Sequence, residues 1–185
     1  MPGPIENVTL FLIETLFELY ILALVLRVLF AWARVDYYNP VSQFLVTITR
    51  PVLQPLRSLI PSLGRLDTAA VVLAIVLQYL QLWLVTALQG FGAGALALVL
   101  VAIVQLLKLV VYVYIFAIII QAVLSWLSPG MHGYSNPAAS VLYDLNEPIL
   151  RPIRQVVPMV GMVDLSPLVA IILLNMVLVL LSSLL

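Results

Sequence analysis

The chain has 185 residues, of which 64% are hydrophobic and 9% are charged, and its eight basic residues balance its eight acidic ones. Soluble domains carry roughly 25% charged residues, and a surface as apolar as this one would aggregate in water. The composition therefore excludes an ordinary soluble protein and predicts a protein of the lipid bilayer. The lack of cysteine excludes disulfides, thiol-attached haem and iron–sulfur clusters on this chain.

A helix needs about 20 apolar residues to cross hydrocarbon, and four segments of the sequence meet this requirement. They cover about residues 8–32, 68–89, 103–127 and 166–185. No Lys or Arg precedes the first segment, so we expect a permanent span rather than a cleaved signal peptide. Ser166 is expected to cap the last span, with Pro167 as its first helical residue.

The third apolar run is longer than a bilayer requires. It continues from Ala95 to Leu127, which as one helix would measure about 50 Å. We expect this helix to project beyond the hydrocarbon layer. The alternative is that residues 95–103 form a separate piece in the interface.

The chain contains an internal repeat. A set of positions between the first two spans returns 97 residues later: Asn39-Pro40, Pro51, Pro55, Arg57, Pro61, Gly64 and Asp67 recur as Asn136-Pro137, Pro148, Pro152, Arg154, Pro158, Gly161 and Asp164. Further upstream the offset is 94 residues, since Tyr20 and Trp32 recur as Tyr114 and Trp126. This predicts two units, residues 1–89 and 96–185, joined by a turn at 90–95.

Each unit reads as span, loop and span, so the fold class is an all-α integral membrane protein with four transmembrane helices. Two crossings return the chain to its starting side, so both units should have the same orientation, related by a pseudo-two-fold axis along the membrane normal. Six of the eight basic residues lie in the two loops: Arg34, Arg50, Arg57, Arg65, Arg151 and Arg154. Basic loops stay in the cytoplasm, which places both termini on the opposite side of the membrane.

Each loop is expected to contain an interfacial amphipathic helix. Asn39 and Asn136 are N-caps followed by Pro, and the later prolines should end or kink these helices. In the first loop an apolar stripe is expected opposite a polar face; the stripe is Val41, Phe44, Leu45 and Ile48, and the polar face is Ser42, Gln43 and Thr49. Such a helix would lie in the headgroup layer with its apolar face down.

The loop arginines allow two interpretations. They could recognise anionic lipid or a phosphate-bearing partner, or serve only as an orientation signal with ordinary headgroup contacts; the residues concerned are Arg50, Arg57, Arg65, Arg151 and Arg154. The repeated turn residues, Gly64 with Asp67 and Gly161 with Asp164, are expected to lead the chain back into the bilayer. Each Asp would complement a helix N-terminus, or, as the second interpretation, pair with Arg57 or Arg154.

Polar residues inside the predicted spans need partners, water or an escape to the interface; they are Glu14, Glu18, Arg27, Gln78, Lys108, Gln121 and Asn175. Glu14 and Lys108 correspond under the 94-residue offset, so we hypothesise an ion pair between them. Arg27 lies about half a turn round the helix from Glu18 and should snorkel to the cytoplasmic side. The amides could hydrogen-bond between spans or line a polar path.

The repeated Asn-Pro, Pro-x-x-x-Pro-x-Arg and Pro-x-x-Gly-x-x-Asp motifs, with Leu165-Ser166-Pro167-Leu168-Val169, closely resemble the YggT family of small bacterial membrane proteins. The first copy departs from the pattern, because Thr68-Ala69-Ala70 replaces Ser-Pro. The resemblance implies a non-enzymatic membrane factor and supplies no catalytic residues. Members have been connected with osmotic-stress tolerance and cell-division gene neighbourhoods, and plastid relatives with haem attachment to cytochrome b6 and with nucleoid distribution.

We therefore expect an accessory or scaffold protein in osmotic stress or envelope organisation, without a cofactor, a metal or direct nucleic-acid binding. Its partners would be the bilayer, including anionic lipids, and another membrane protein or a second copy of the chain. The alternative is a small channel or transporter whose intramembrane polar residues line a path. An enzyme ranks third, for want of a nucleophile with its base.

Overall fold

The computed structural model describes residues 3–62, 64, 66–90, 92, 94–127, 136–157 and 164–185. These residues form six α-helices: α1 (Pro4–Ala33), α2 (Pro40–Leu59), α3 (Thr68–Leu88), α4 (Ala95–Leu127), α5 (Pro137–Val156) and α6 (Ser166–Ser182). The predicted all-α class is thus confirmed.

Three of the helices are long and apolar enough to cross a membrane: Asn7–Ala33 in α1, Thr68–Leu88 in α3 and Ala95–Ser125 in α4. The apolar helix α6 has 17 residues, or about 26 Å of rise, which is somewhat shorter than a typical span. The third apolar run is one continuous helix of 33 residues, so residues 95–103 continue α4 rather than form a separate piece.

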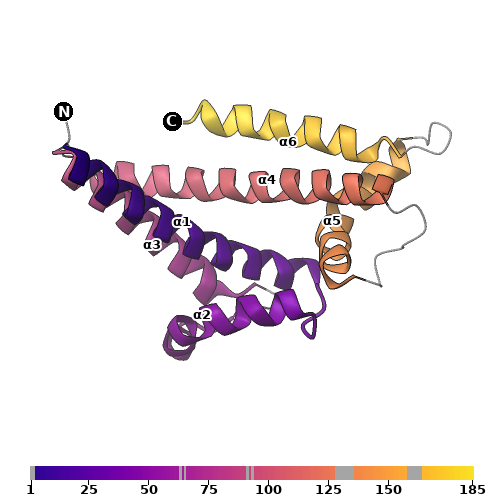
Figure 1. Cartoon of the computed structure of the whole chain (residues 1–185), viewed down its shortest axis with the longest axis horizontal. Helices are drawn as coiled ribbons and strands as arrows, with labels where there is room; N and C mark the ends of the chain where they lie inside the picture. Colours follow the sequence, from indigo (N-terminus) through magenta and orange to yellow (C-terminus); the bar gives the residue numbers. More distant parts are fainter. Residues whose placement is uncertain are drawn as a thin grey trace.

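The long helices pack in the order α1, α3, α4 and α6, each against the next. In Figure 1 both chain termini lie at the left of the view, whereas α5 and the C-terminal end of α1 lie at the right. Helix α2 lies below α1 and α3 and contacts both. Helix α5 contacts α4 and α6 in the corresponding way.

Packing inside the two repeats therefore matches, but packing between them does not follow the predicted two-fold axis. Helix α3 contacts α4, but the symmetry-related pair, α6 with α1, makes no contact within the described residues. Likewise, α1 contacts α5, but the symmetry-related pair, α4 with α2, does not touch there. Figure 1 shows the reason: α5 lies between the end of α4 and the end of α1, while α2 lies outside the pair α1 and α3. Helix α5 thus lies between the two repeats, and helix α2 does not.

The start of each loop helix is as predicted, and of the two effects expected of the later prolines, an end or a kink, the end is not observed. The Asn39 and Asn136 side chains accept hydrogen bonds from the backbone N–H groups of Val41, at 2.9 Å, and Ala138, at 3.0 Å. Both helices then continue through the later prolines instead of ending there. Pro51 and Pro55 lie on the exposed side of α2, where the carbonyls that lose a partner face outward, while the opposite side remains packed.

The buried face of α2 also differs from the predicted apolar stripe. It consists of Ser42, Leu45, Thr49 and Leu53, whereas the Phe44 side chain, predicted to belong to the stripe, is 62% exposed. The polar residues Ser42 and Thr49 face the bundle because Arg27 of α1 lies there and Thr49 bonds to it. This face positions the site described next.

Candidate functional site

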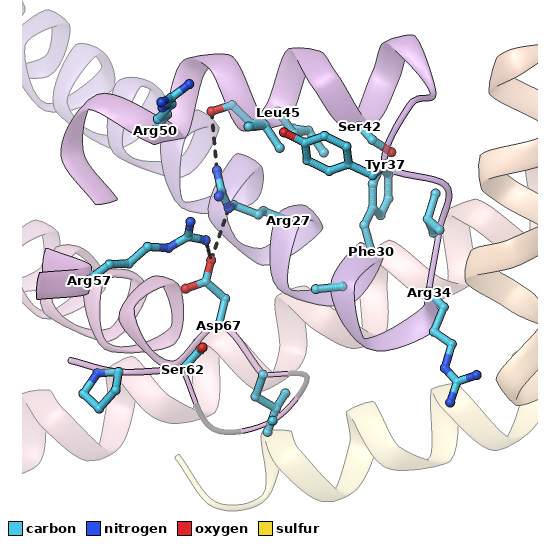
Figure 2. Close-up of a pocket in the computed structure, with 16 residues that line it drawn as sticks. Arg27, Phe30, Arg34, Tyr37, Ser42, Leu45, Arg50, Arg57, Ser62 and Asp67 are labelled. Carbon is cyan, nitrogen blue, oxygen red and sulfur yellow. Dashed lines mark hydrogen bonds and ion pairs between the residues drawn. The ribbon is translucent and has the colours of Figure 1, made fainter. Parts of the chain in front are cut away.

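Arg27 is the central residue of a polar cluster at the junction of α1, α2 and α3. Its side chain is 10% exposed. Its Nε donates to Asp67 Oδ2 at 3.2 Å, and its Nη1 donates to the Val46 carbonyl at 3.4 Å and to the Thr49 hydroxyl. Arg27 thus reaches residues of the first loop, the side toward which it was expected to snorkel, and a carboxylate from a distant part of the chain neutralises it inside the protein (Figure 2).

Asp67 serves three groups at once. It is the N-cap of α3 and accepts from the Ala70 N–H at 3.4 Å, and its Oδ2 accepts from both Arg27 and Arg57. Burial acts to raise its pKa, but the hydrogen bond and charge of Arg57, with the Ala70 N–H and the Arg27 charge, outweigh burial and hold the pKa below its usual value. Both interpretations of Asp67, helix-end residue and partner of Arg57, are confirmed.

The second repeat reproduces this arrangement around Arg154. Arg154 Nε donates to Asp164 Oδ2 at 3.0 Å, and Nη1 donates to Glu147 Oε2 at 3.2 Å. Asp164 Oδ1 also accepts from the Ser166 N–H at 2.9 Å. Burial acts to raise the pKa of Asp164, but hydrogen bonds from Ser166 and Arg154 keep it below its usual value.

Ser166 was predicted to be the N-cap of the last span, and this is wrong. Leu165 occupies the cap position without a side-chain hydrogen bond, and Ser166 is the first residue of α6. The Asp164 carboxylate, two residues earlier, accepts a hydrogen bond from the Ser166 backbone N–H, one of the free N–H groups in the first turn of α6.

A second pair of matched contacts holds each loop helix to its long helix. Arg27 of α1 bonds to Thr49 of α2, and Gln121 of α4 accepts from Asn146 Nδ2 of α5 at 2.7 Å. Gln121 and Asn146 lie 94 and 97 residues after Arg27 and Thr49. The same junction is therefore charged in the first repeat and neutral in the second.

A cavity of about 900 Å³ lies beside the first cluster. Its charged lining residues are Arg27, Arg34, Arg50, Arg57 and Asp67, an excess of three positive charges. In Figure 2 the side chains of Arg27, Arg57 and Asp67 point toward one another, whereas Arg34 points away from them. Ser42 also lines the cavity, and its hydroxyl is buried without a hydrogen-bond partner.

The second loop has the opposite balance. Glu147 occupies the position that corresponds to Arg50, so Arg154 faces two carboxylates. Nearby, burial first of all raises the pKa of Asp144, and the charges of Asp36 and Glu147 add to this, against the hydrogen bond from the Asp36 backbone. The duplicated loops are alike in backbone and different in charge.

The remaining predicted loop residues are only partly brought together. Arg50 and Arg151 are exposed, and no acid lies within ion-pair distance of either in the described part of the chain. Gly64 has φ +60°, a conformation that favours glycine, in the expected turn. Arg65 and Gly161 lie outside the described residues.

The intramembrane polar residues do not converge. Gln78 Nε2 donates to Gln81 at 3.1 Å and to Gln105 of α4 at 2.8 Å, so this amide joins two long helices as predicted. Asn175 instead donates to the Ile171 carbonyl of its own helix at 2.8 Å. Sequence reasoning did not single out Gln81 or Gln105.

The hypothesised ion pair between Glu14 and Lys108 is not formed in the described structure. Glu14 and Glu18 are exposed on α1, and Lys108 is partly exposed on α4. The correspondence under the repeat offset does not bring these residues together, because α1 and α4 both pack against α3 and only slightly against one another.

Sequence reasoning also missed the contacts of several loop residues. Asn39 donates from Nδ2 to the Pro137 carbonyl at 2.8 Å and to Ser140 Oγ at 3.1 Å, which joins the two loop helices. Thr49 and Asn146 are both polar and correspond under the 97-residue offset. A comparison of all polar pairs at this offset, rather than of identical residues alone, would have found them.

The helical architecture and the paired polar junctions define a membrane protein built from two related units. The family model CCB3/YggT matches residues 7–88 and, separately, 100–185, so the chain belongs to the CCB3/YggT family.

Three relatives cover most of the chain. An uncharacterised protein of Pseudomonas aeruginosa is 37% identical over 94% of this chain and 87% of its own length. YggT of Escherichia coli K12 is 34% identical over 92% of this chain and 87% of its own length. An uncharacterised protein of Vibrio alginolyticus is 38% identical over 86% of this chain and 85% of its own length. All three are uncharacterised, so the likeness establishes the family and no activity. No solved structure matches the chain.

Replacement of the two matched aspartates should have unequal effects on stability. Asp67→Asn leaves Arg27 buried without its counter-charge, which should lower the free energy of unfolding by about 3–5 kcal/mol. Asp164→Asn should cost about 1 kcal/mol, because Arg154 keeps Glu147 and its side chain is 30% exposed. Denaturant unfolding of both variants in the same detergent measures the difference, and equal losses would contradict this account of the cluster.

Proposed function

We propose that this protein is a non-enzymatic accessory or scaffold protein of the bacterial inner membrane, with four spans, both loops in the cytoplasm and both termini in the periplasm. Helices α2 and α5 would lie in the headgroup layer, where their arginines contact lipid headgroups or a membrane partner. The role that we propose for the protein is in osmotic-stress tolerance or envelope organisation.

The observation that carries the scaffold proposal is how the polar groups are used. The buried charges and amides join helices to one another: Arg27 to α2 and α3, Gln121 to α5 and Gln78 to α4. A path through the monomer would instead require such groups to line a passage. Polar contacts that hold two arginine-bearing helices at the ends of apolar helices are what a platform requires.

One observation favours the alternative, a small channel or transporter. Glu14 and Glu18 are exposed on α1, within a helix long and apolar enough to cross the membrane. Exposed carboxylates are costly in hydrocarbon. A second copy of the chain that covered this face could place them along a path between protomers.

The proposed orientation can be tested by labelling, because the natural chain has no cysteine. A membrane-impermeant maleimide added to intact spheroplasts should label Gln89→Cys and Leu184→Cys, and should label Tyr38→Cys only after permeabilisation. These positions follow α3, follow α6 and precede α2, and all are exposed. Protection of Leu184→Cys alone would mean that α6 does not cross, and the reverse pattern for all three would contradict cytoplasmic loops.

Ion flux distinguishes a scaffold from a channel. Liposomes that contain the purified protein should show the same ion permeability as protein-free liposomes, with an added ionophore as the positive control. A flux that appears with the protein and is lost in Glu14→Gln would refute the scaffold proposal and establish the alternative.

A further inference from the structure

We propose that the cavity beside Arg27 binds a phosphate-bearing ligand, and that this ligand is the headgroup of an anionic phospholipid. The inference rests on the proposed function in one respect, since it uses the placement of α2 in the headgroup layer. It goes further by assigning a defined site to one loop only.

The charges around the cavity are not compensated by the protein. Arg27 and Arg57 share the single carboxylate of Asp67, while Arg34 and Arg50 have no acid within ion-pair distance in the described part of the chain. Arg27 and Arg57 approach the same carboxylate and repel one another, and Arg34 and Arg50 add positive charge at exposed positions of the lining. An anion in the cavity would remove this cost, and arginine is the residue best suited to phosphate, because its planar fork of donors matches phosphate oxygens.

Ser42 adds a polar residue to the lining of the cavity. It is 6% exposed, and its hydroxyl is covered by protein and has no hydrogen-bond partner, a property that it shares with the hydroxyls of Tyr20, Tyr114 and Ser166. Buried hydroxyls are nearly always satisfied in native proteins. The hydroxyl is a donor as well as an acceptor, so a phosphate or glycerol oxygen of the ligand would complete it.

The second repeat lacks these three arginines and the serine. The residues that correspond to Arg27, Arg34, Arg50 and Ser42 are Gln121, Ser128, Glu147 and Ala139. Arg154, which corresponds to Arg57, is bonded to Glu147 and Asp164. The backbone arrangement therefore forms without the excess positive charge, which indicates that this charge in the first loop has a use outside the folding of the loop.

The size and lining of the cavity favour a lipid headgroup over free phosphate. Its volume of about 900 Å³ is at the upper end of ligand sites, which span roughly 300–1,000 Å³, and inorganic phosphate would leave most of it unfilled. Apolar side chains, among them Phe30, Leu45 and Leu66, line the rest. A ligand with a phosphate at one end and glycerol and acyl carbon at the other matches both parts.

Binding can be measured on delipidated protein in a neutral detergent. The probes are short-chain phosphatidylglycerol, short-chain phosphatidylcholine and inorganic phosphate, and the readout is the shift of the thermal unfolding midpoint with probe concentration. We expect phosphatidylglycerol to bind more tightly than either other probe by about tenfold or more. Phosphate that binds as tightly as phosphatidylglycerol would overturn the headgroup as the ligand.

Two variants that each add a carboxylate show whether the cavity is the site. Arg50→Glu copies the second repeat and should weaken phosphatidylglycerol binding by about tenfold or more, whereas Gln155→Glu, which adds a carboxylate at an exposed position of α5 outside the cavity, should leave it unchanged. Equal weakening by both variants would mean that only general surface charge attracts the lipid, and would overturn the site. If Arg50→Glu does not fold, two milder variants replace it: Ser42→Ala, which removes one donor without changing charge, and Arg50→Gln. Unchanged phosphatidylglycerol binding in both of these variants would also overturn the proposed site.

This experiment and the test of the scaffold proposal fail independently. The binding measurement uses soluble probes and detergent, so a negative result leaves the ion-flux and labelling outcomes untouched. Ion flux abolished by Glu14→Gln would refute the scaffold without altering the binding curves, because Glu14 does not line the cavity.

Discussion

A buried arginine near the end of an apolar helix is the constraint on which the first repeat depends. The Arg27 side chain is almost completely buried, and an unpaired charge in such a place lowers the free energy of unfolding by several kcal/mol. Asp67 offsets this cost and, because it also caps α3 and bonds Arg57, it ties α1, α2 and α3 to one point. The loop helix, the turn and the start of the second long helix are positioned together by one carboxylate.

The second repeat shows that the backbone arrangement does not require the buried charge. Gln121 and Asn146 occupy the corresponding positions with a neutral hydrogen bond, and Arg154 is matched by two acids. Duplication thus preserved the frame and allowed the electrostatics to diverge. One loop became internally balanced, while the other retained an excess of arginine beside a cavity, and this difference locates the candidate site in the first loop.

The features that sequence predicts well here are local. The repeat offset, the Asn caps and the Arg–Asp relation depend on residues close in the chain or repeated in it. The partner of Arg27 was missed because it lies 40 residues away, and the helical-phase argument considered only partners in the same span. The buried face of α2 was missed because Ser42 and Thr49 are polar and face a charge that only the tertiary fold brings there. The predicted two-fold axis was wrong because the placement of α5 between α1 and α4 depends on packing between the repeats.

A double-mutant cycle on Arg27 and Asp67 tests the central claim most directly. Arg27→Gln, which installs the residue of the second repeat, Asp67→Asn and the double variant are compared by the free energy of unfolding in detergent. If the pair holds the first repeat together, the coupling energy should be about 2 kcal/mol or more, and Asp67→Asn should cost little once Arg27 is gone. Additive effects, within about 0.5 kcal/mol, would show that the two residues act independently and would contradict the account.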